Sequence, residues 1–483
     1  MMIMPTTAPK SCSPATGTRA APPNPLPSLS ASNAAPRLLL LAALALSAAA
    51  DCSFSTVSRP APLPRSPHAA RPAKQHLLSP FAWPGRAQRS LLRLDAATPA
   101  ATAARSGAAT GAARPVIMDE SQLSALVQLN EAWGTWAGNS NAATACAAWA
   151  GVTCSPKGLV LALDAKAFVA DPPPSGAIPA DITNLAYLQY LDLSYIDLVG
   201  SIPSLASLTS LTHLAIGMDG CRLAGTLDGL GWLSSLSNLQ TLRLVGLADF
   251  TGDLSSLHIL SHLESIQHLA LSSLTNATGE IPREIRYLTA LTALDLSYLR
   301  AVDFPDWVTQ LPNLQSLNVN ADDERRQGLL SDDFSLLTAL TSLSLGHNNL
   351  DGYLPKSWSS LVNLQELDLT YNRLQGTIPA TFSTLTALTK LVLSENSLSG
   401  SIPPAFSTNI QILWLGYNSF SGPIPPHLAL TNLVELQLSS NLFTGGIPSA
   451  FTKLTAMSTL DICNNSLSSD LDVVAQMTWL TDI

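Results

Sequence analysis

Leucine recurs at regular intervals through most of the chain, and this spacing indicates how the chain folds. The best copies of the repeat read L-x-x-L-x-x-L-x-L-x-x-N-x-L-x-G-x-I-P, and the copies that begin at Leu361 and Leu385 are 24 residues apart. Internal repetition with such a period is typical of a solenoid. Weaker copies extend the pattern to about twelve units, which begin at Leu185, Leu208, Leu236, Leu263, Leu288, Leu311, Leu337, Leu361, Leu385, Phe406, Leu430 and Leu454.

Each unit contains an L-x-L pair, in which one residue separates two leucines. This period of two is typical of a short β-strand that turns its leucines to one face and the intervening residue to the other. No unit can bury its leucines alone, because a single short strand has nothing to cover its apolar face. Stacked units therefore share one continuous core and align their strands in a parallel sheet on the concave side of an arc.

Two further motifs resemble those of plant extracellular leucine-rich-repeat proteins, a family that includes receptor-like ectodomains and polygalacturonase-inhibiting proteins. Residues 146–154 read Cys-Ala-Ala-Trp-Ala-Gly-Val-Thr-Cys and resemble the N-terminal cap of that family. The element Gly-x-Ile-Pro, first found at residues 176–179, resembles the plant class of repeat. It recurs in full or in part at Pro203, Pro282, Pro355, Pro379, Pro403, Pro425 and Pro448.

The resemblance covers residues 119–483 and implies an α/β solenoid, a leucine-rich-repeat horseshoe with a parallel β-sheet on its concave face. It implies a second short strand and a helical turn on the convex side of each unit. It also implies an N-terminal cap over residues 119–178 with a helix and a disulfide between Cys146 and Cys154. Closing so small a loop contributes about 2–3 kcal/mol and needs an oxidising compartment. Two reduced core cysteines beside Trp149 are the alternative.

An asparagine follows the strand in the C-terminal units, at Asn348, Asn372, Asn396, Asn418, Asn441 and Asn465. As the family resemblance implies, its amide should satisfy backbone groups of adjacent coils and form a buried polar ladder. The earlier units have other residues at this position, namely Ile196, Cys221, Leu247, Leu274, Leu299 and Asp322. Inserted residues at 217–220 and 322–327 should bulge as loops, which often carry function on a rigid scaffold, although simple drift is the plainer explanation.

The first 118 residues differ in charge from the rest of the chain, with a net charge of +10 against −19 for residues 119–483. The apolar run at 38–50 follows Arg37 and is shorter than the roughly 20 residues of a membrane span. We therefore interpret residues 1–50 as a signal peptide with a long leader. An organelle transit peptide and a wrongly assigned start codon are the alternatives. Residues 51–118 are rich in alanine, proline and arginine, and we predict that they are disordered.

The predicted cap begins with a short amphipathic helix. Asp119 and Gln122 resemble a helix capping box, and Leu123, Leu126 and Trp133 follow at helical spacing. Residues 179–483 then hold the repeats.

The sequence ends inside the repeat pattern. Val474, Met477 and Leu480 begin a further unit, and no C-terminal cap, membrane helix or kinase domain follows them. We interpret this end as an incomplete gene model. The alternative is an oligomer or a partner that covers the open end.

The sequence contains no motif that points to catalysis, a cofactor or a metal. His258 and His262 have metal-ligand spacing, but no glutamate follows His258 as a zinc protease would require. His213 and His268 fall in one outward column of the sheet, and we interpret them as solvated surface. Nucleophile-elbow, phosphate-loop and dinucleotide fingerprints are missing from the sequence. We therefore predict a protein that is not an enzyme and that needs no cofactor.

The acidic repeat region also changes the expected partners. Nucleic acid binds basic surfaces that displace counterions from phosphates, so we expect no nucleic-acid partner. The arginines of the basic N-terminal segment are scattered among alanine, proline and serine. Membrane association is expected only through an uncleaved leader or a partner.

The outward positions of the strands are where we expect a ligand to bind, because a concave sheet presents side chains of successive units about 4.8 Å apart. Aromatic residues on such a surface commonly anchor interfaces, although tyrosine and aspartate are also ordinary at exposed positions. One outward column holds Asp192, Arg243, Asp295, Asn318, Asp368, Trp414, Gln437 and Asp461. The next holds Tyr195, Tyr298, His347, Tyr371, Glu395 and Tyr417.

We expect binding to centre on the C-terminal half of this face, where the repeat is most regular and a rigid sheet reduces the entropy lost on binding. Aromatic anchors among acidic groups suit a basic protein or peptide, and a neutral glycan could use the same aromatics. The predicted ligand-binding residues are Glu366, Asp368, Tyr371, Glu395, Trp414 and Tyr417.

The predicted function is therefore non-catalytic recognition of a protein, peptide or glycan ligand by a secreted or cell-surface protein. The N-glycosylation sequons at Asn276 and Asn464 fit that location, and Asn276 is the more favourable because Asn464 lies close to the sheet. One alternative is an inhibitor of a secreted cell-wall-degrading enzyme. Another is an organellar or intracellular scaffold, which would require a transit peptide and reduced cap cysteines.

Overall fold

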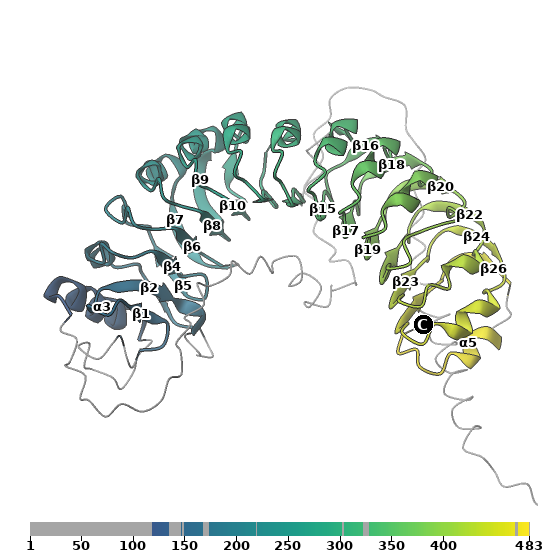
Figure 1. Cartoon of the computed structure of the whole chain (residues 1–483), viewed down its shortest axis with the longest axis horizontal. Helices are drawn as coiled ribbons and strands as arrows, with labels where there is room; N and C mark the ends of the chain where they lie inside the picture. Colours follow the sequence, from purple (N-terminus) through teal and green to yellow (C-terminus); the bar gives the residue numbers. More distant parts are fainter. Residues whose placement is uncertain are drawn as a thin grey trace, which may run out of the picture.

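A computed structural model describes residues 118–134, 146, 149–167, 173–218, 220–301, 304–321, 328–468 and 472–482. These residues form a curved solenoid with the N-terminal helix at one end and the last described residues at the other (Figure 1). The predicted signal peptide at 1–50, the predicted disordered segment at 51–118 apart from Met118, and the predicted loop at 322–327 lie outside the described residues.

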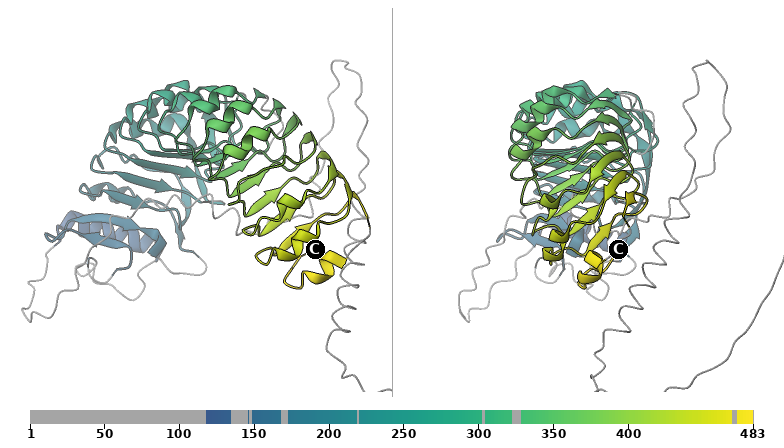
Figure 2. Two further views of the ribbon diagram at one scale, coloured as in Figure 1. Left: turned by 45° about the vertical axis from the view of Figure 1, so that its right-hand side comes forward. Right: turned by 90° about the vertical axis from the view of Figure 1, so that its right-hand side faces the viewer.

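One sheet of 14 strands lines the concave side of the solenoid (Figures 1 and 2). At the N-terminal end, β1 (Val152–Cys154) pairs antiparallel with β2 (Val160–Asp164), and every later pairing in this sheet is parallel. The remaining strands come from twelve successive units, as the leucine spacing predicts. They are β4 (Tyr190–Asp192), β6 (His213–Ile216), β8 (Thr241–Val245), β10 (His268–Ser272), β12 (Ala293–Asp295), β13 (Ser316–Asn318), β15 (Ser342–Ser344), β17 (Glu366–Asp368), β19 (Lys390–Val392), β21 (Ile412–Trp414), β23 (Glu435–Gln437) and β25 (Thr459–Asp461).

A second set of short parallel strands lies across the core from the concave sheet, as the family resemblance implies. A group of five comprises β3 (Ser175–Gly176), β5 (Asp197–Gly200), β7 (Arg222–Thr226), β9 (Asp249–Asp253) and β11 (Ala277–Thr278). A group of seven comprises β14 (Gly328–Leu329), β16 (Leu350–Tyr353), β18 (Arg373–Gly376), β20 (Ser397–Gly400), β22 (Ser419–Pro423), β24 (Leu442–Gly445) and β26 (Ser466–Leu467).

Short 3₁₀ helices complete the units on the outer side of the arc (Figure 1). The cap holds η2 (Ala165–Ala167). The repeats hold η3 (Ala180–Asn184), η4 (Leu227–Ser235), η5 (Leu254–His262), η6 (Arg283–Tyr287), η7 (Asp306–Gln310), η8 (Asp332–Leu336), η9 (Lys356–Ser360), η10 (Ala380–Thr384), η11 (Pro426–Leu428) and η12 (Ser449–Lys453).

The Gly-x-Ile-Pro element makes the turn from the second strand into the outer helix. Gly376 ends β18 with a φ of 77°, and a Cβ atom there would lie 2.6 Å from the ring of Tyr353. Pro379 then occupies the N-cap of η10 with a φ of −62°, which is the value that its ring enforces. Ile378 between them is buried in the core. Gly376 therefore provides the left-handed backbone of the turn, Ile378 fills the core, and Pro379 fixes the backbone at the start of the helix.

The N-terminal cap begins with α3 (Glu120–Trp133), but the capping-box prediction is wrong. Asp119 is the N-cap residue and its side chain makes no capping hydrogen bond. The side chain of Gln122 is buried instead, and its Oε1 accepts from the backbone N–H of Val160 at 2.8 Å. Trp133 Nε1 donates to the Ala177 carbonyl at 2.8 Å. Both bonds tie the helix to the first coils rather than to its own first turn.

Cys146 and Cys154 form the disulfide that the family resemblance implies, with their Cα atoms 5.5 Å apart. Cys154 lies in β1 and packs, like Cys146, against the hydrophobic core. Trp149 between them is also buried. The disulfide therefore joins Cys146 to the first strand of the concave sheet, beside the buried Trp149.

The asparagine ladder is present in the C-terminal half, and Asn372 shows how it works. Its Oδ1 accepts from the backbone N–H of Leu350 at 2.9 Å, and its Nδ2 donates to the Leu345 carbonyl at 2.9 Å, both in the preceding coil. Asn396, Asn418, Asn441 and Asn465 make the same pair of bonds one coil further on. Each side chain thus satisfies backbone groups that the turn would otherwise bury without a partner.

The N-terminal half fills the same position with apolar side chains, as the sequence predicts. Ile196, Leu247, Leu274 and Leu299 are all buried there. Cys221 is also buried, and its thiol lies 3.3 Å from the Gly246 carbonyl, to which it can donate a weak hydrogen bond. This half therefore has apolar packing at the positions where the C-terminal half has the paired asparagine bonds to the preceding coil.

A second asparagine ladder, which the sequence analysis did not identify, follows the rim of the solenoid ahead of the concave strands. Each of these side chains donates from Nδ2 to the carbonyl of a threonine in the preceding coil, at 2.9–3.1 Å. The asparagines are Asn238, Asn313, Asn363, Asn409 and Asn432. Because this ladder begins earlier in the chain than the first one, it links coils of both halves.

A further coil begins at the C-terminal end, as the sequence predicts. Val474 in α5 (Asp472–Gln476) and Met477 are buried against the core. Asp482 pairs with Thr459 of β25 in a parallel bridge. Within the described part of the chain, no helix has the length and apolar character to cross a membrane.

Replacing Asn372 by alanine should lower the free energy of unfolding by about 1–3 kcal/mol, because buried backbone groups of two coils lose their partner. Chemical denaturation gives this value. The matched control is Gln365→Ala, since the side chain of Gln365 is exposed on the same coil. Equal denaturation midpoints for the two variants would contradict the role given to the ladder.

Candidate functional site

The strand register confirms the first outward column of the concave face. Asp368 on β17 aligns with Val392, then with Trp414, Gln437 and Asp461 on the following strands. The flanking leucines of these strands are fully buried, so the intervening side chains are the ones that the sheet presents to the inside of the arc. Two of the predicted residues, Asp368 and Trp414, therefore lie in one row, two strands apart.

A parallel row of charged residues runs beside Asp368 and Trp414. Glu366 aligns with Lys390, then with Ile412 and Glu435. Glu435 accepts a hydrogen bond from Trp414 Nε1 at 3.2 Å, which fixes the indole across the two rows. The surface therefore also contains a basic side chain, because Lys390 lies next to Glu366.

Desolvation raises the pKa of two predicted carboxylates, although one of them, Glu395, keeps an exposed side chain. Burial raises the pKa of Asp368, an effect to which nearby Glu366 adds and which the Thr370 N–H and Lys390 oppose. Burial also raises the pKa of Glu395. Each carboxylate would be stabilised by an additional cation or hydrogen-bond donor. The surface thus holds acceptors whose charge the protein itself does not fully compensate.

The second predicted column occupies the turn after each strand. Tyr371, Glu395 and Tyr417 have φ values of 54°, 57° and 55°, in the left-handed region. This conformation costs about 1–3 kcal/mol per residue and persists because each backbone N–H donates to a carbonyl of the next coil at 2.8–3.0 Å. Tyr371 and Tyr417 are 43% exposed. The turn therefore holds these large side chains at fixed, accessible positions.

Aromatic stacking further orders this column. His347 stacks on Tyr371, with their ring centroids 4.8 Å apart and their planes inclined by 20°. His347 has the same left-handed backbone, with a φ of 59°. Tyr371, Glu395 and Tyr417 thus lie in the turns after β17, β19 and β21, next to the two strand rows.

A second polar cluster lies in the N-terminal half of the concave face. Tyr190, His213, Thr241 and His268 align in register on four consecutive strands. The rings of Tyr190 and His213 are stacked with centroids 4.2 Å apart. His213 is only 8% exposed, and its buried Nε2 makes no hydrogen bond with the described residues.

The interpretation of His213 as solvated surface is therefore wrong. Tyr190 and Thr241 on the neighbouring strands cover the imidazole, and burial lowers the pKa of His213 to about 4. The position of His213 and His268 in one column is confirmed. The sequence places these residues in a column but does not show that a neighbouring ring covers one of them.

Asp192 and Lys166 form an ion pair at the edge of this cluster, with Nζ and Oδ2 3.2 Å apart. Burial alone would raise the pKa of Asp192, but hydrogen bonds from the Ser194 hydroxyl and N–H, together with Lys166, lower it. The carboxylate is thus charged and fully engaged by its own coil and by the cap.

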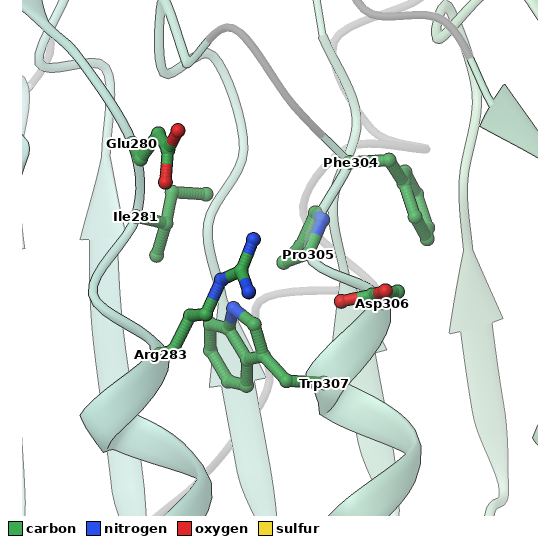
Figure 3. A pocket seen from close by; sticks show the side chains of 7 residues that line it. All are labelled: Glu280, Ile281, Arg283, Phe304, Pro305, Asp306 and Trp307. Atoms are coloured by element: carbon green, nitrogen blue, oxygen red, sulfur yellow. The ribbon is translucent and has the colours of Figure 1, made fainter.

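A small pocket opens away from the concave face, between two adjacent units. Its lining comes from the turns before η6 and η7 and from the first residues of these helices (Figure 3). The side chains are Glu280, Ile281, Arg283, Phe304, Pro305, Asp306 and Trp307. None of the predicted ligand-binding residues contributes to it.

The described residues show no group of three or more histidine, cysteine, aspartate or glutamate side chains placed to hold a metal ion. His258 and His262 both lie on η5, and each Nδ1 is within hydrogen-bond distance of a backbone carbonyl of the same helix, Ser255 or Ile259. Their four-residue spacing is thus accounted for by local bonds on an exposed helix.

Comparison with known families and structures gives three findings. Residues 327–374 and 363–420 match a family model described as leucine rich repeat, and residues 432–454 match a second model with that description. The crystal structure of PEPR1-AtPEP1 matches with a TM-score of 0.54 and 30% identity, over 72% of this chain and 49% of that chain. No curated protein matches the sequence.

A second solved structure has the same fold. It is the leucine-rich-repeat ectodomain of the Arabidopsis receptor kinase HAESA, in complex with an N-terminally extended IDA peptide hormone. The TM-score is 0.52 and the identity 23%, over 75% of this chain and 76% of that chain. This chain spans about half the length of the PEPR1 chain.

The buried His213 should make stability depend on pH. Its pKa of about 4 in the folded protein is below the ordinary value of 6.5, so protons favour the unfolded chain. The stability that depends on a neutral His213 is fully present above pH 6.5. It falls by about 2–3 kcal/mol as the pH falls towards 4. His213→Phe, which keeps a ring against Tyr190, should lose less stability than the wild type between pH 7 and pH 4.5.

Urea denaturation at the two pH values measures this difference. The control is His262→Gln, because His262 is exposed on η5, and its loss of stability should match that of the wild type. If His213→Phe and the wild type lose the same free energy on acidification, the imidazole is not buried in its neutral form.

Proposed function

We propose that the chain is a leucine-rich-repeat protein of the plant type that recognises a protein or peptide ligand through the C-terminal half of its concave face, without catalysis. The proposed contacts are Glu366, Asp368, Tyr371, Glu395, Trp414 and Tyr417. The observation that carries this proposal is that the turns hold Tyr371, Glu395 and Tyr417 in a strained backbone conformation while the aromatic side chains stay accessible.

Rigidity supports this choice of surface. The asparagine ladder joins the coils that contribute all six residues, and Glu435 restrains the Trp414 indole. A surface that is already ordered loses little conformational entropy on binding. Tryptophan and tyrosine in such positions bury a large area with few rotatable bonds.

Charge supports a basic ligand. Asp368 and Glu395 have raised pKa values because burial removes solvent without supplying enough donors. A lysine or arginine of the ligand would stabilise both carboxylates in their charged form. Lys390 beside Glu366 limits where such a group fits, so the basic group is expected between the Asp368 row and the turn column.

The ligand class rests on this chain's own surface. The peptide hormone in the HAESA complex is a ligand of HAESA, and at 23% identity that likeness is one of fold. An extended peptide fits a concave sheet because it can cross many strands and contact successive rows. A folded basic protein that presents an exposed segment would use the same contacts.

We also propose that the protein works outside the cell. The Cys146–Cys154 disulfide favours an oxidising compartment, and the interpretation of residues 1–50 as a signal peptide stays a prediction. Asn276 is exposed in the turn before β11, where a glycan has room. Asn464 is exposed too, but its Nδ2 donates to Ser440 Oγ at 3.1 Å beside the ladder, so we propose Asn276 as the main glycosylation site.

Replacing Trp414 by alanine should weaken binding to the partner captured with the full chain by about 30-fold, because truncating an anchor typically costs about 2 kcal/mol or more. Titration calorimetry gives the affinity. Glu395→Gln should chiefly change the association rate and its salt dependence.

The control for Trp414→Ala is Lys453→Ala, since Lys453 is exposed on the outer helix η12. If both variants bind the partner as tightly as the wild type, the proposed surface is not the binding site.

The protein purified from its natural source should show Cys146 and Cys154 resistant to alkylation until a reductant is added, and a glycan on Asn276. Peptide mass spectrometry reads both. Thr278→Val should remove that glycan, because it destroys the sequon, whereas Thr275→Val just outside the sequon should keep it. Alkylation of both thiols without reductant would exclude the extracellular location.

A further inference from the structure

Arg243 lies on the concave face without an acceptor. It occupies the outward position of β8 between the buried Leu242 and Leu244. Its side chain is partly exposed and makes no hydrogen bond or ion pair with the described residues, among which only Lys166–Asp192 and Arg222–Asp197 are ion pairs. A guanidinium carries five N–H donors in a planar fork, and none of the described residues engages them.

Small residues flank Arg243 on both sides. Ala215 on β6 and Ala270 on β10 are its partners in the register. The next side chains in the row are Asp192 and Asp295, each two strands away, or about 10 Å at ordinary strand spacing. The row therefore leaves room beside the guanidinium, and neither carboxylate reaches it.

Both carboxylates are committed elsewhere. Asp192 pairs with Lys166 and accepts from Ser194. Asp295 is almost fully buried, and its Oδ1 accepts from the Ser297 N–H at 3.0 Å. These bonds hold the two carboxylates on their own coils. Arg243 acts on Asp295 through its charge, which opposes the rise in pKa that burial causes, and the structure shows no hydrogen bond or ion pair between the two described side chains.

His268 supplies a second donor beside Arg243. Its Nδ1 lies 3.2 Å from the hydroxyl of Thr241, a buried side chain for which the structure shows no other hydrogen bond. Because the structure shows no other acceptor for this buried hydroxyl, we assign Nδ1 as its acceptor and place the ring proton of a neutral His268 on Nε2. Burial and then the charge of Arg243 lower the pKa of His268, which keeps the ring neutral near pH 7.

We propose that Arg243, together with the Nε2–H of His268, binds a carboxylate of the ligand on the N-terminal half of the concave face. Arg243 and His268 lie on adjacent strands and both offer N–H donors, and a guanidinium binds a carboxylate through two parallel hydrogen bonds. This inference rests on the proposed function, because it assigns a second contact of the same ligand. The carboxylate belongs to an acidic side chain or to a chain terminus.

The spacing of the two contacts sets the size and polarity of the ligand. β8 and β17, the strand of Asp368, are five steps apart in the sheet, or about 24 Å across the strands at 4.8 Å per step. An extended chain covers that distance with roughly seven residues. The ligand thus carries an acidic group roughly seven residues from the basic group that meets Asp368 and Glu395.

Small carboxylate compounds test this site without the natural ligand. The full chain, labelled in its histidine rings, is titrated at low salt and pH 7 with N-acetylaspartate N-methylamide, with N-acetylalanine, and with the neutral N-acetylasparagine N-methylamide. The spectrum of His268→Gln assigns the His268 resonance. We expect a saturable shift of that resonance with a carboxylate compound and at least tenfold weaker affinity for the neutral compound. In Arg243→Met the affinity for the carboxylate compound should fall by about tenfold or more.

Arg222→Met is the control, because Arg222 lies on β7, away from the concave sheet, and it should bind as the wild type does. A stronger shift with the aspartate compound identifies a side chain as the natural group, and a stronger shift with N-acetylalanine identifies a chain terminus. Equal shifts with the neutral compound, no saturable shift, or an unchanged Arg243→Met would overturn the site. Trp414→Ala should keep the shift, because Trp414 lies outside the carboxylate site. If Trp414→Ala binds the partner as tightly as the wild type while the shift is intact, only the proposed function is contradicted.

Discussion

Buried backbone groups near the turns after the concave strands need partners, and neighbouring coils supply them. In the C-terminal half a single asparagine per coil does this, as when Asn372 accepts from the Leu350 N–H and donates to the Leu345 carbonyl. The same turns place Tyr371 and Tyr417 in the left-handed region. The exposed aromatic column thus depends on bonds between coils, because no coil could hold that conformation alone.

The repeat pattern predicts most of the fold because its signals are local. Leucines at a period of two indicate a strand with one buried face, and the glycine before proline indicates the turn into the outer helix. The pattern predicts less of the site. The capping box at Asp119 is wrong because Gln122 bonds to Val160, a residue 38 positions away. His213 is misread because Tyr190 of the preceding coil covers it. Both errors concern contacts between coils, which a single repeat does not contain.

The two halves of the concave face have complementary chemistry on one scaffold. The C-terminal half offers carboxylates and exposed aromatic rings, with the pKa of Asp368 and Glu395 raised by burial. The N-terminal half offers Arg243 beside two alanines and leaves its own carboxylates bonded to neighbouring groups. An extended ligand that is acidic at one end and basic at the other would match both halves in only one direction, which gives orientation as well as affinity.

Hydrogen–deuterium exchange of the full chain tests most directly whether the ladder makes the concave face one rigid unit. The amides of Leu374, Leu398 and Phe420 donate to asparagine Oδ1 atoms of the next coil, although they lie outside the concave sheet. The account predicts that they exchange as slowly as the amides of β17, β19 and β21, because one cooperative opening exposes both sets. Exchange of these three amides at the rate of exposed loop amides would contradict it.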